Sequence, residues 1–331
     1  MTTVFVSGAS GFIAQHVVKQ LIEKDYKVVG SVRSAAKGDQ LKQDLDTPNF
    51  QYEIVEELSA PGAFDQALKK HPEVTVFLHT ASPFRFDIED IERDLLKPAI
   101  DGTKNALSSI KKYGPQVSKV VVTTSDIAMS YVNGDSSSPA ITEDSWCDTT
   151  YEESLTNSFA GYRGSKTFAE KAAWEFVKQE NPNFTLNTVA PTLVLGPQAF
   201  ASGIRGTLNT SSEIINAVLK NGPDESTVPD INANFIDVRD VARAHLHAFE
   251  SDVKNFRYLV VQSQFCLQYV LDALNKGIPS LKGKIPVGDG SKTEGLKSLP
   301  KVDNSRTRNL LGEFIPLEQS VVDSANQILN S

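Results

Sequence analysis

Cysteine, methionine and tryptophan are rare in this sequence, and long apolar runs are missing. The 331 residues include two of each of these three types. The cysteines, Cys147 and Cys266, cannot make a zinc ribbon or a disulfide framework, and reduced thiols are typical of a cytosolic protein. No apolar run approaches the roughly 20 residues of a membrane-spanning helix, and no Lys or Arg precedes position 19, as a signal peptide would require. We therefore expect a cytoplasmic protein without a membrane anchor.

Positive charge is also in short supply. Lys and Arg number 33 against 41 Asp and Glu, which gives a net charge of −8. Such a surface offers no broad attractive field to nucleic acid or to anionic lipid, so we expect neither as a partner. The five histidines are scattered, and His245 and His247 stand two positions apart on an expected helix, where they point to different faces. The sequence therefore predicts no metal site.

Short apolar strands alternate with amphipathic helices from residue 4 onwards. Helices are expected at 12–22, at 89–112 with a break near Pro98, at 165–180 and at 238–249. The expected strands cover 4–6, 27–32, 50–55, 74–78, 120–123, 185–190 and 258–261. Near-continuous apolar strands separated by helices predict a parallel sheet that is covered on both faces.

The alternation weakens after Pro191. Residues 191–231 are richer in Gly, Asn, Ser and Pro, and the tail 263–331 is mostly helix and loop. We predict an α/β chain with a Rossmann-type doubly wound parallel sheet and a smaller, mostly helical C-terminal substrate lobe. The sheet domain is expected to comprise 1–190 and 235–262, and the smaller lobe 191–234 and 263–331.

A glycine-containing turn joins the first strand to the first helix. Its pattern is Gly8-x-x-Gly11-x-x-Ala14, in which Gly8 makes the tight turn, Gly11 lets the backbone approach a pyrophosphate, and Ala14 lets the helix pack closely on the strand. The phosphates would bind the N–H groups at the helix N-terminus. We therefore expect a dinucleotide, held at this turn by Gly8, Ala9, Ser10, Gly11, Phe12 and Ile13.

The end of the second strand indicates which dinucleotide binds. An acidic residue there would bind the ribose 2′-hydroxyl of NAD. This chain instead has Arg33, with Lys37 four positions on, and a guanidinium can bind a 2′-phosphate. The sequence therefore predicts NADPH/NADP+ as the cofactor.

Three polar residues point to proton transfer at a carbonyl. Tyr162 and Lys166 are four positions apart, so a helix places the phenol and the ammonium on one face. We expect Lys166 to lower the pKa of Tyr162, so that the phenol exchanges a proton near neutral pH. Ser125 ends the fifth expected strand and can hydrogen-bond a substrate carbonyl beside the tyrosine.

With these motifs, the chain resembles the extended short-chain dehydrogenases/reductases over nearly its whole length. More narrowly, it resembles the fungal NADPH-dependent methylglyoxal and 3-methylbutanal reductases, which are similar to plant dihydroflavonol reductases. The narrow resemblance is carried by 11–16, 92–96 and 168–176. The broad resemblance is carried by 8–14, 79–83, 124–125, Tyr162 with Lys166, 190–191 with 196–197, and 235–242.

The resemblance implies an NADPH-dependent carbonyl reductase that reduces aldehydes and ketones such as methylglyoxal and 3-methylbutanal. Tyr162 would be the general acid, Lys166 would hold the nicotinamide ribose, and Ser125 would orient the carbonyl. The other implied cofactor contacts are Thr80, Ala81 and Ser82 at the ribose and nicotinamide, Glu57 and Leu58 near the adenine, Pro191 and Val194 at the nicotinamide amide, with Thr123 and Ser211 elsewhere along the cofactor.

Three positions depart from the family pattern. Residues 98–102 lack the Asn that many relatives use behind the lysine, and Glu57 stands where Asp is more usual. Asp126 follows the serine, where related reductases carry an aromatic or small residue. Nucleotide-sugar dehydratases place an Asp-Glu pair there, of which Asp126-Ile127 is half. A nucleotide-sugar epimerase/dehydratase and a catalytically silent NADP-sensing protein therefore remain as alternatives.

The substrate is expected to be a small molecule. Loops after the fourth, fifth and sixth expected strands supply candidate pocket residues, most of them apolar, which suits a small uncharged or aromatic carbonyl compound. These candidates are Phe84, Phe86, Asp126, Met129, Thr192, Phe200 and Ile204. A monomer or a homodimer is equally compatible with the sequence.

Overall fold

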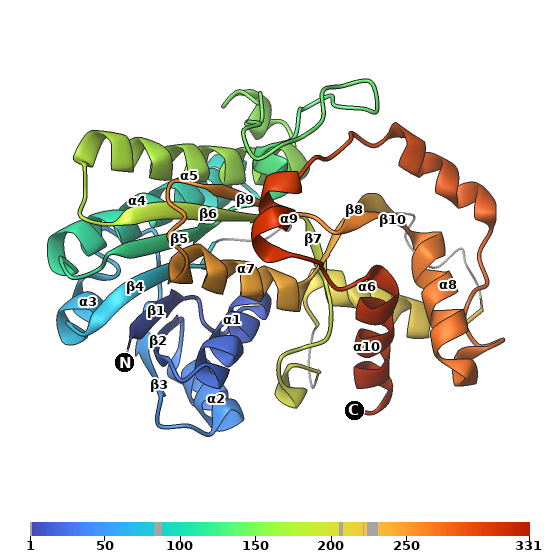
Figure 1. Cartoon of the computed structure of the whole chain (residues 1–331), viewed down its shortest axis with the longest axis horizontal. Helices are drawn as coiled ribbons and strands as arrows, with labels where there is room; N and C mark the ends of the chain where they lie inside the picture. The colour runs from blue at the N-terminus through green and yellow to red at the C-terminus, as the bar shows by residue number, and fades with distance from the viewer. Residues whose placement is uncertain (1, 83–87, 205–207, 221, 224–230) are drawn as a thin grey trace. The chain divides into compact units, whose positions relative to one another are not determined.

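The computed structural model describes residues 2–82, 88–204, 208–220, 222–223 and 231–331, which form two compact units (Figure 1). Unit 1 comprises Met1–Val132, Glu143–Ala190 and Ala242–Leu259, and unit 2 comprises Asn133–Thr142, Pro191–Val241 and Val260–Ser331. Among the residues that the structure describes, no helix has both the length and the apolar character to cross a membrane.

Unit 1 is built on a seven-stranded sheet in the order β3-β2-β1-β4-β5-β6-β9. Its strands are β1 (Thr3–Ser7), β2 (Lys27–Val32), β3 (Phe50–Ile54), β4 (Val74–His79), β5 (Lys119–Thr123), β6 (Thr185–Pro191) and β9 (Arg257–Val260). All pairs from β3 to β6 are parallel. The strand order reverses between β1 and β4, and such a switch point opens a crevice at the carboxyl ends of the strands.

Helices cover both faces of this sheet (Figure 1). One face carries α1 (Phe12–Glu23), α2 (Ala35–Leu45) and α7 (Val238–Glu250), and the other carries α3 (Asp65–Lys70), α4 (Lys97–Tyr113) and α5 (Ser158–Glu180). Under α3–α5 the core is aromatic: the rings of Phe5 and Phe77 stack with centroids 4.7 Å apart, and Phe64 meets Phe5 edge-on at 6.1 Å. The doubly wound Rossmann-type fold predicted from the sequence is confirmed.

Two helices of unit 1 differ from their predicted ranges for local reasons. A π-helical segment, Glu92–Leu96, leads into α4, and Pro98 lies in the first turn of that helix, where its missing N–H is tolerated. Helix α5 begins at Ser158 rather than at 165 because Asn157 caps it, its Oδ1 accepting the N–H of Ala160 at 2.9 Å. The earlier start places Tyr162 inside the helix.

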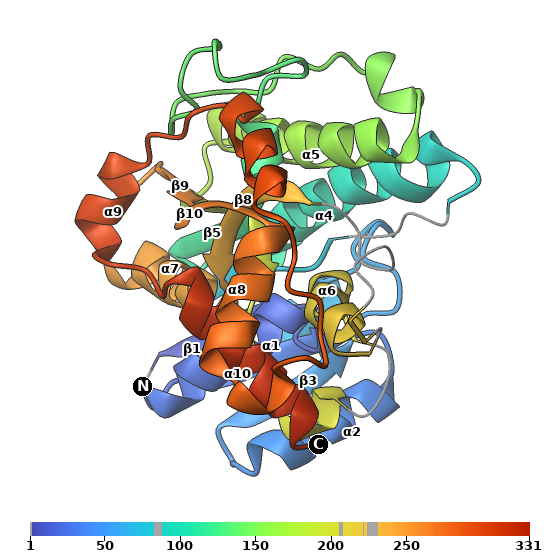
Figure 2. The same ribbon diagram turned by 90° about the vertical axis from the view of Figure 1, so that its right-hand side faces the viewer.

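Unit 2 contains a three-stranded sheet, β10-β8-β7, that the sequence did not predict. Its strands are β7 (Leu193–Leu195), β8 (Asn232–Asp237) and β10 (Ser263–Cys266). The sheet packs with α6 (Thr210–Lys220), α8 (Leu267–Gly277) and α10 (Leu317–Leu329) around a second core, in which α8 and α10 lie side by side (Figure 2). Helix α9 (Ser305–Leu311) precedes the last helix. The helices supply most of the regular structure of unit 2, as expected.

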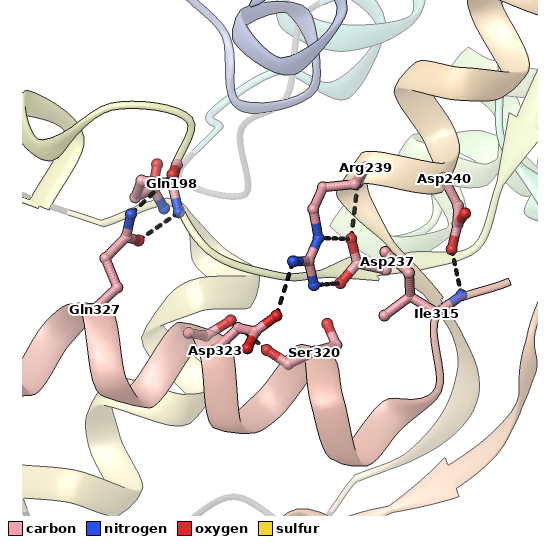
Figure 3. Close-up of polar contacts among 9 residues, drawn as sticks. Gln198, Asp237, Arg239, Asp240, Ile315, Ser320, Asp323 and Gln327 are labelled. Carbon is pink, nitrogen blue, oxygen red and sulfur yellow. Dashed lines mark hydrogen bonds and ion pairs between the residues drawn. The ribbon is translucent and has the colours of Figure 1, made fainter. Parts of the chain in front are cut away.

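Polar contacts tie α10 to the rest of unit 2 (Figure 3). The buried carboxylate of Asp237 accepts hydrogen bonds from Arg239 Nε at 2.9 Å and from Nη2 at 2.8 Å, and Arg239 Nη1 donates to Asp323 of α10 at 2.7 Å. Gln198 and Gln327 exchange two further hydrogen bonds of 2.7 and 2.9 Å. The stretch 235–242, one of the motifs of the family resemblance, therefore holds the C-terminal helix in place.

Candidate active site

The glycine turn of unit 1 leaves room for an anion. Gly8 adopts φ +66°, and a Cβ added there would lie 3.0 Å from the Cβ of Ala81, so glycine is required. The N–H groups of Phe12 and Ile13, the first residues of α1, have no acceptor within the helix. Together with the helix dipole they form a site for a phosphate group. The residues present therefore fit a dinucleotide.

Contacts from the ends of β2 and β4 brace the turn. The N–H of Ala9 donates to the Ser31 carbonyl at 2.8 Å, and that of Gly8 donates to Ser31 Oγ at 3.1 Å. On the other side, the Ala81 N–H donates to Ser7 Oγ at 3.0 Å, and Thr80 Oγ1 donates to the Ser7 carbonyl. The predicted cofactor residues at the ends of β1 and β4 therefore lie together.

The exposed basic side chain of Arg33 lies near a carboxylate beyond β3. Glu57 accepts hydrogen bonds from Ser59, which hold its pKa below the usual range, and the positive charge of Arg33 lowers that pKa further. Leu58 packs on α4, where Gly102 makes room: a Cβ at Gly102 would lie 1.9 Å from Leu58 Cδ1. Of the residues predicted for the adenine end, Glu57 therefore lies near Arg33 and Leu58 lies against α4. Lys37 is exposed in the first turn of α2.

The three predicted catalytic residues come together in unit 1. Ser125 follows β5 and is buried, and its Oγ lies 3.4 Å from Asp126 Oδ1. A hydrogen bond links the side chains of Ser125 and Tyr162. Lys166, one turn further along α5, is buried with its Nζ 5.8 Å from the centroid of the Tyr162 ring. A carbonyl oxygen placed at Ser125 and Tyr162 would meet two hydroxyl groups.

The pKa of Tyr162 in this cluster differs from the predicted one. Burial and, to a smaller extent, the negative charge of Asp126 raise the pKa of Tyr162, the hydrogen bond with Ser125 lowers it, and together they place it at about 12. Burial lowers the pKa of Lys166 to about 8. The expectation that the pKa of Tyr162 is lowered is therefore wrong, because desolvation of the buried phenolate is the largest contribution and raises it. Tyr162 keeps its proton across the neutral range.

A small cavity adjoins Lys166. It measures about 10 Å³, which is close to the space one water molecule occupies. Its polar lining includes His79, Thr103, Lys166 and Glu170. Burial and the charge of Lys166 lower the pKa of His79 to about 4, and Ser7 Oγ lies 2.9 Å from its Nδ1. No role was predicted for His79 or Glu170, although both lie in stretches that carry the family resemblance, 79–83 and 168–176.

A protein-family model matches most of this chain. The model of the NAD dependent epimerase/dehydratase family matches residues 4–260. The chain belongs to this family. Its fold and its glycine turn are those expected of the epimerase/dehydratase family. Within the described ranges, no group of three or more His, Cys, Asp and Glu side chains could hold a metal ion.

Relatives within the epimerase/dehydratase family extend over the full chain. A Candida albicans protein provisionally named NADPH-dependent methylglyoxal reductase GRP2 is 54% identical, over 99% of this chain and 98% of its own length. The solved structure of Candida albicans Gre2 in complex with NADPH superposes with a TM-score of 0.95 at 50% identity and covers 100% of this chain and 99% of that one. The yeast methylglyoxal/isovaleraldehyde reductase Gre2, complexed with NADPH, gives 0.93 at 43% identity, with 99% and 98% covered. The resemblance to fungal methylglyoxal reductases is confirmed.

The remaining predicted residues are distributed as follows. Thr123 lies at the end of β5, and its Oγ1 is 2.7 Å from His245 Nε2. Asp126 is partly exposed beside the serine, whereas Met129 has no exposed surface. Phe84 and Phe86 lie outside the described residues. The predicted residues that belong to unit 2 are Pro191, Thr192, Val194, Phe200, Ile204 and Ser211.

Proposed function

We propose that this chain is an NADPH-dependent carbonyl reductase that converts small aldehydes and ketones, of the methylglyoxal and 3-methylbutanal type, into alcohols. The observation that carries the proposal is the cluster of Ser125, Tyr162 and Lys166 in unit 1, in which the phenol keeps its proton at neutral pH. Relatives named as NADPH-dependent reductases of such compounds, similar over the full chain, support the substrate class.

NADPH supplies the hydride when it is bound. Residues 8–13 would hold its pyrophosphate, with the N–H groups of Phe12 and Ile13 as donors, and Arg33 with Lys37 would bind its 2′-phosphate. Ser125 Oγ donates a hydrogen bond to the carbonyl oxygen and orients it, and Tyr162 transfers its proton to that oxygen as negative charge develops there. Fixed donors aimed at a developing charge are usually the largest single contribution to catalysis.

The other proposed contacts follow the sequence prediction. Thr80, Ala81, Ser82 and Thr123, at the ends of β4 and β5, would contact the cofactor, and Lys166 would hold the nicotinamide ribose. Glu57 and Leu58 border the adenine. Unit 2 is proposed to contribute Pro191, Val194 and Ser211 to the cofactor and Thr192, Phe200 and Ile204 to the substrate. Asp126, Met129, Phe84 and Phe86 stay predicted substrate residues, and a cytoplasmic monomer or homodimer stays the expected form.

Arg33→Ala is expected to raise KM for NADPH far more than KM for NADH. A charge-assisted hydrogen bond of about 1.5–3 kcal/mol to the 2′-phosphate corresponds to roughly 10- to 150-fold. Steady-state kinetics with both nucleotides measure the ratio, and the exposed Lys42→Ala in α2 is the matched control. An equal change for the two nucleotides would reject the 2′-phosphate contact.

Asp126→Asn is expected to lower the pKa of Tyr162, because it removes a negative charge that raises it. Oxidation of an alcohol with NADP+ requires the tyrosinate, so the rise of that rate with pH should begin at lower pH in the variant. The pH profile of alcohol oxidation measures the pH at which the rate begins to rise, with Asp44→Asn in α2 as the control. An unmoved onset would show that Asp126 does not act on Tyr162.

NADPH consumption with methylglyoxal and with 3-methylbutanal tests the function itself. A carbonyl reductase consumes one NADPH for each alcohol formed. An epimerase converts a nucleotide sugar without net NADPH consumption, and a silent sensor binds NADPH but reduces nothing. Asp126-Ile127 lacks the acidic second residue of the dehydratase pair, and the chain keeps Tyr162 and Lys166, so both alternatives fit the residues less well.

A further inference from the structure

A buried ion pair lies behind the proposed catalytic cluster. Glu170, one turn after Lys166 on α5, has no exposed side-chain surface. Its Oε1 accepts hydrogen bonds from Arg257 Nε at 2.7 Å, Thr188 Oγ1 at 2.9 Å and Trp174 Nε1 at 3.2 Å. Its Oε2 accepts from Arg257 Nη2 at 3.0 Å and from Thr124 Oγ1 at 3.0 Å. One carboxylate therefore joins α5 to residues in β6 and β9 and at the end of β5.

The guanidinium of Arg257 also contacts a different segment, residues 143–146. Its Nη1 donates to the carbonyl of Glu143 at 3.2 Å and to that of Ser145, and the guanidinium lies 3.8 Å from the centroid of the Trp146 ring. Planar donors and a cation–π contact of this kind suit arginine and not lysine. Arg257 thus fixes 143–146 relative to α5.

Glu170 and Arg257 each contact a segment that is connected to the proposed catalytic Ser125. Thr124, which donates to the buried carboxylate, directly precedes Ser125, and its own N–H donates to the Val189 carbonyl at 2.8 Å. The segment held by the guanidinium continues to Cys147, whose N–H donates to the Ala128 carbonyl at 2.8 Å, within the turn that follows Ser125. Ser125 is therefore held on its N-terminal side through Thr124 and on its C-terminal side through Ala128.

We infer that Glu170 and Arg257 are positioning residues that set the place of Ser125 relative to Tyr162 and Lys166. The inference rests on the proposed function, because it concerns the same reduction. The pair touches neither hydroxyl, and it joins the element that carries Ser125 to the helix that carries the other two. Misplacing a reacting group by about 1 Å can slow a reaction by roughly 100-fold.

The pair acts through geometry and not through charge. Glu170 lines the same small cavity as Lys166, but the guanidinium of Arg257 neutralises the carboxylate at 2.7 Å. The pKa of Lys166 is accordingly lowered by burial and not raised by a free neighbouring anion. A change that keeps both charges and loosens the contacts should therefore reduce the rate without moving its pH dependence.

Arg257→Lys makes this change, because a lysine keeps the positive charge but cannot bind Glu170, Glu143 and Ser145 at once. We expect kcat to fall by about 10-fold with the midpoint of its pH profile unchanged. In a Ser125→Ala background the same substitution should lower kcat by less than about 2-fold, because the group that it misplaces is already gone. Glu180→Gln is the control: it breaks the half-exposed pair with Lys111 at the far end of α5 and should leave kcat unchanged.

The outcomes separate the inference from the function. If the wild-type protein reduces no carbonyl compound, the proposed function fails and the inference with it. If the wild type is active and Arg257→Lys lowers kcat equally in both backgrounds, the pair does not act through Ser125 and the inference is overturned. A shifted pH midpoint in Arg257→Lys would equally overturn it in favour of an electrostatic role. If the variant is too unstable to assay, Thr124→Val, which removes only the hydroxyl contact with Glu170, takes its place with the same expected non-additivity.

Discussion

Replacing Tyr162 with phenylalanine is expected to lower kcat for carbonyl reduction by about 1,000-fold. The variant loses the hydroxyl that protonates the carbonyl oxygen, and a positioned general acid contributes roughly 10²- to 10⁴-fold. Because burial keeps the pKa of Tyr162 near 12, no other protonation state of the phenol supplies the rate at neutral pH. NADPH should still bind, since the glycine turn and Arg33 are unchanged. Steady-state kinetics and a titration of NADPH fluorescence measure the two quantities.

Tyr151→Phe is the matched control for this variant. Its phenol is also partly buried and hydrogen-bonded, to Glu92 at 3.0 Å, and burial likewise raises its pKa. We expect its kcat to equal that of the wild type. If Tyr162→Phe also kept the wild-type kcat, Tyr162 would have no part in the reaction.

Replacing Lys166 with methionine should lower kcat by about 100-fold or more and yet stabilise the protein without nucleotide. Burial lowers the pKa of Lys166 to about 8 from a usual value of 10.5, so the folded state disfavours the charged form. At about 1.4 kcal/mol per pKa unit, this shift corresponds to roughly 3 to 4 kcal/mol of destabilisation. It is fully present below pH 8, where folded Lys166 is protonated, and it disappears as the pH rises to 10.5. An apolar side chain of similar length removes it.

Urea unfolding at pH 7 and at pH 10.5 measures this gain. The difference between Lys166→Met and the wild type should be large at pH 7 and small at pH 10.5. Lys178→Met, on an exposed turn of α5, is the control and should change the free energy of unfolding by less than about 0.5 kcal/mol. A loss of stability in Lys166→Met at pH 7 would show that the ammonium is stabilised by its surroundings and not strained by burial.

The sequence predicted the sheet of unit 1 because its strands are short, apolar and buried on both faces. The range 27–32 matches β2, Lys27–Val32, and the others agree to within one or two residues. The sheet of unit 2 was missed for the opposite reason. Asn232–Asp237 mixes polar and apolar residues, and it becomes a strand through its pairing with Leu193–Leu195 and Ser263–Cys266, both distant along the chain. Local periodicity carries no such information.

The catalytic cluster of the candidate site was predictable because it depends on the spacing of its residues along the sequence. The four-residue separation of Tyr162 and Lys166 and the position of Ser125 at a strand end were sufficient to bring the three residues together. The pKa of Tyr162 was not predictable, because it depends on burial by the folded chain. Glu170 and Arg257 are 87 positions apart, and the one available signal was a charged residue followed by Ala172 and Ala173 on the buried face of a helix.

Transfer of deuterium to 3-methylbutanal from NADPH that carries deuterium at both positions of the nicotinamide C4 tests the central claim most directly. With the wild-type protein, mass spectrometry should find one deuterium on the alcohol carbon of the product for each NADPH consumed, and Tyr162→Phe should give almost no labelled alcohol in the same time. An alcohol without label, or no alcohol while the protein binds NADPH, would contradict the account.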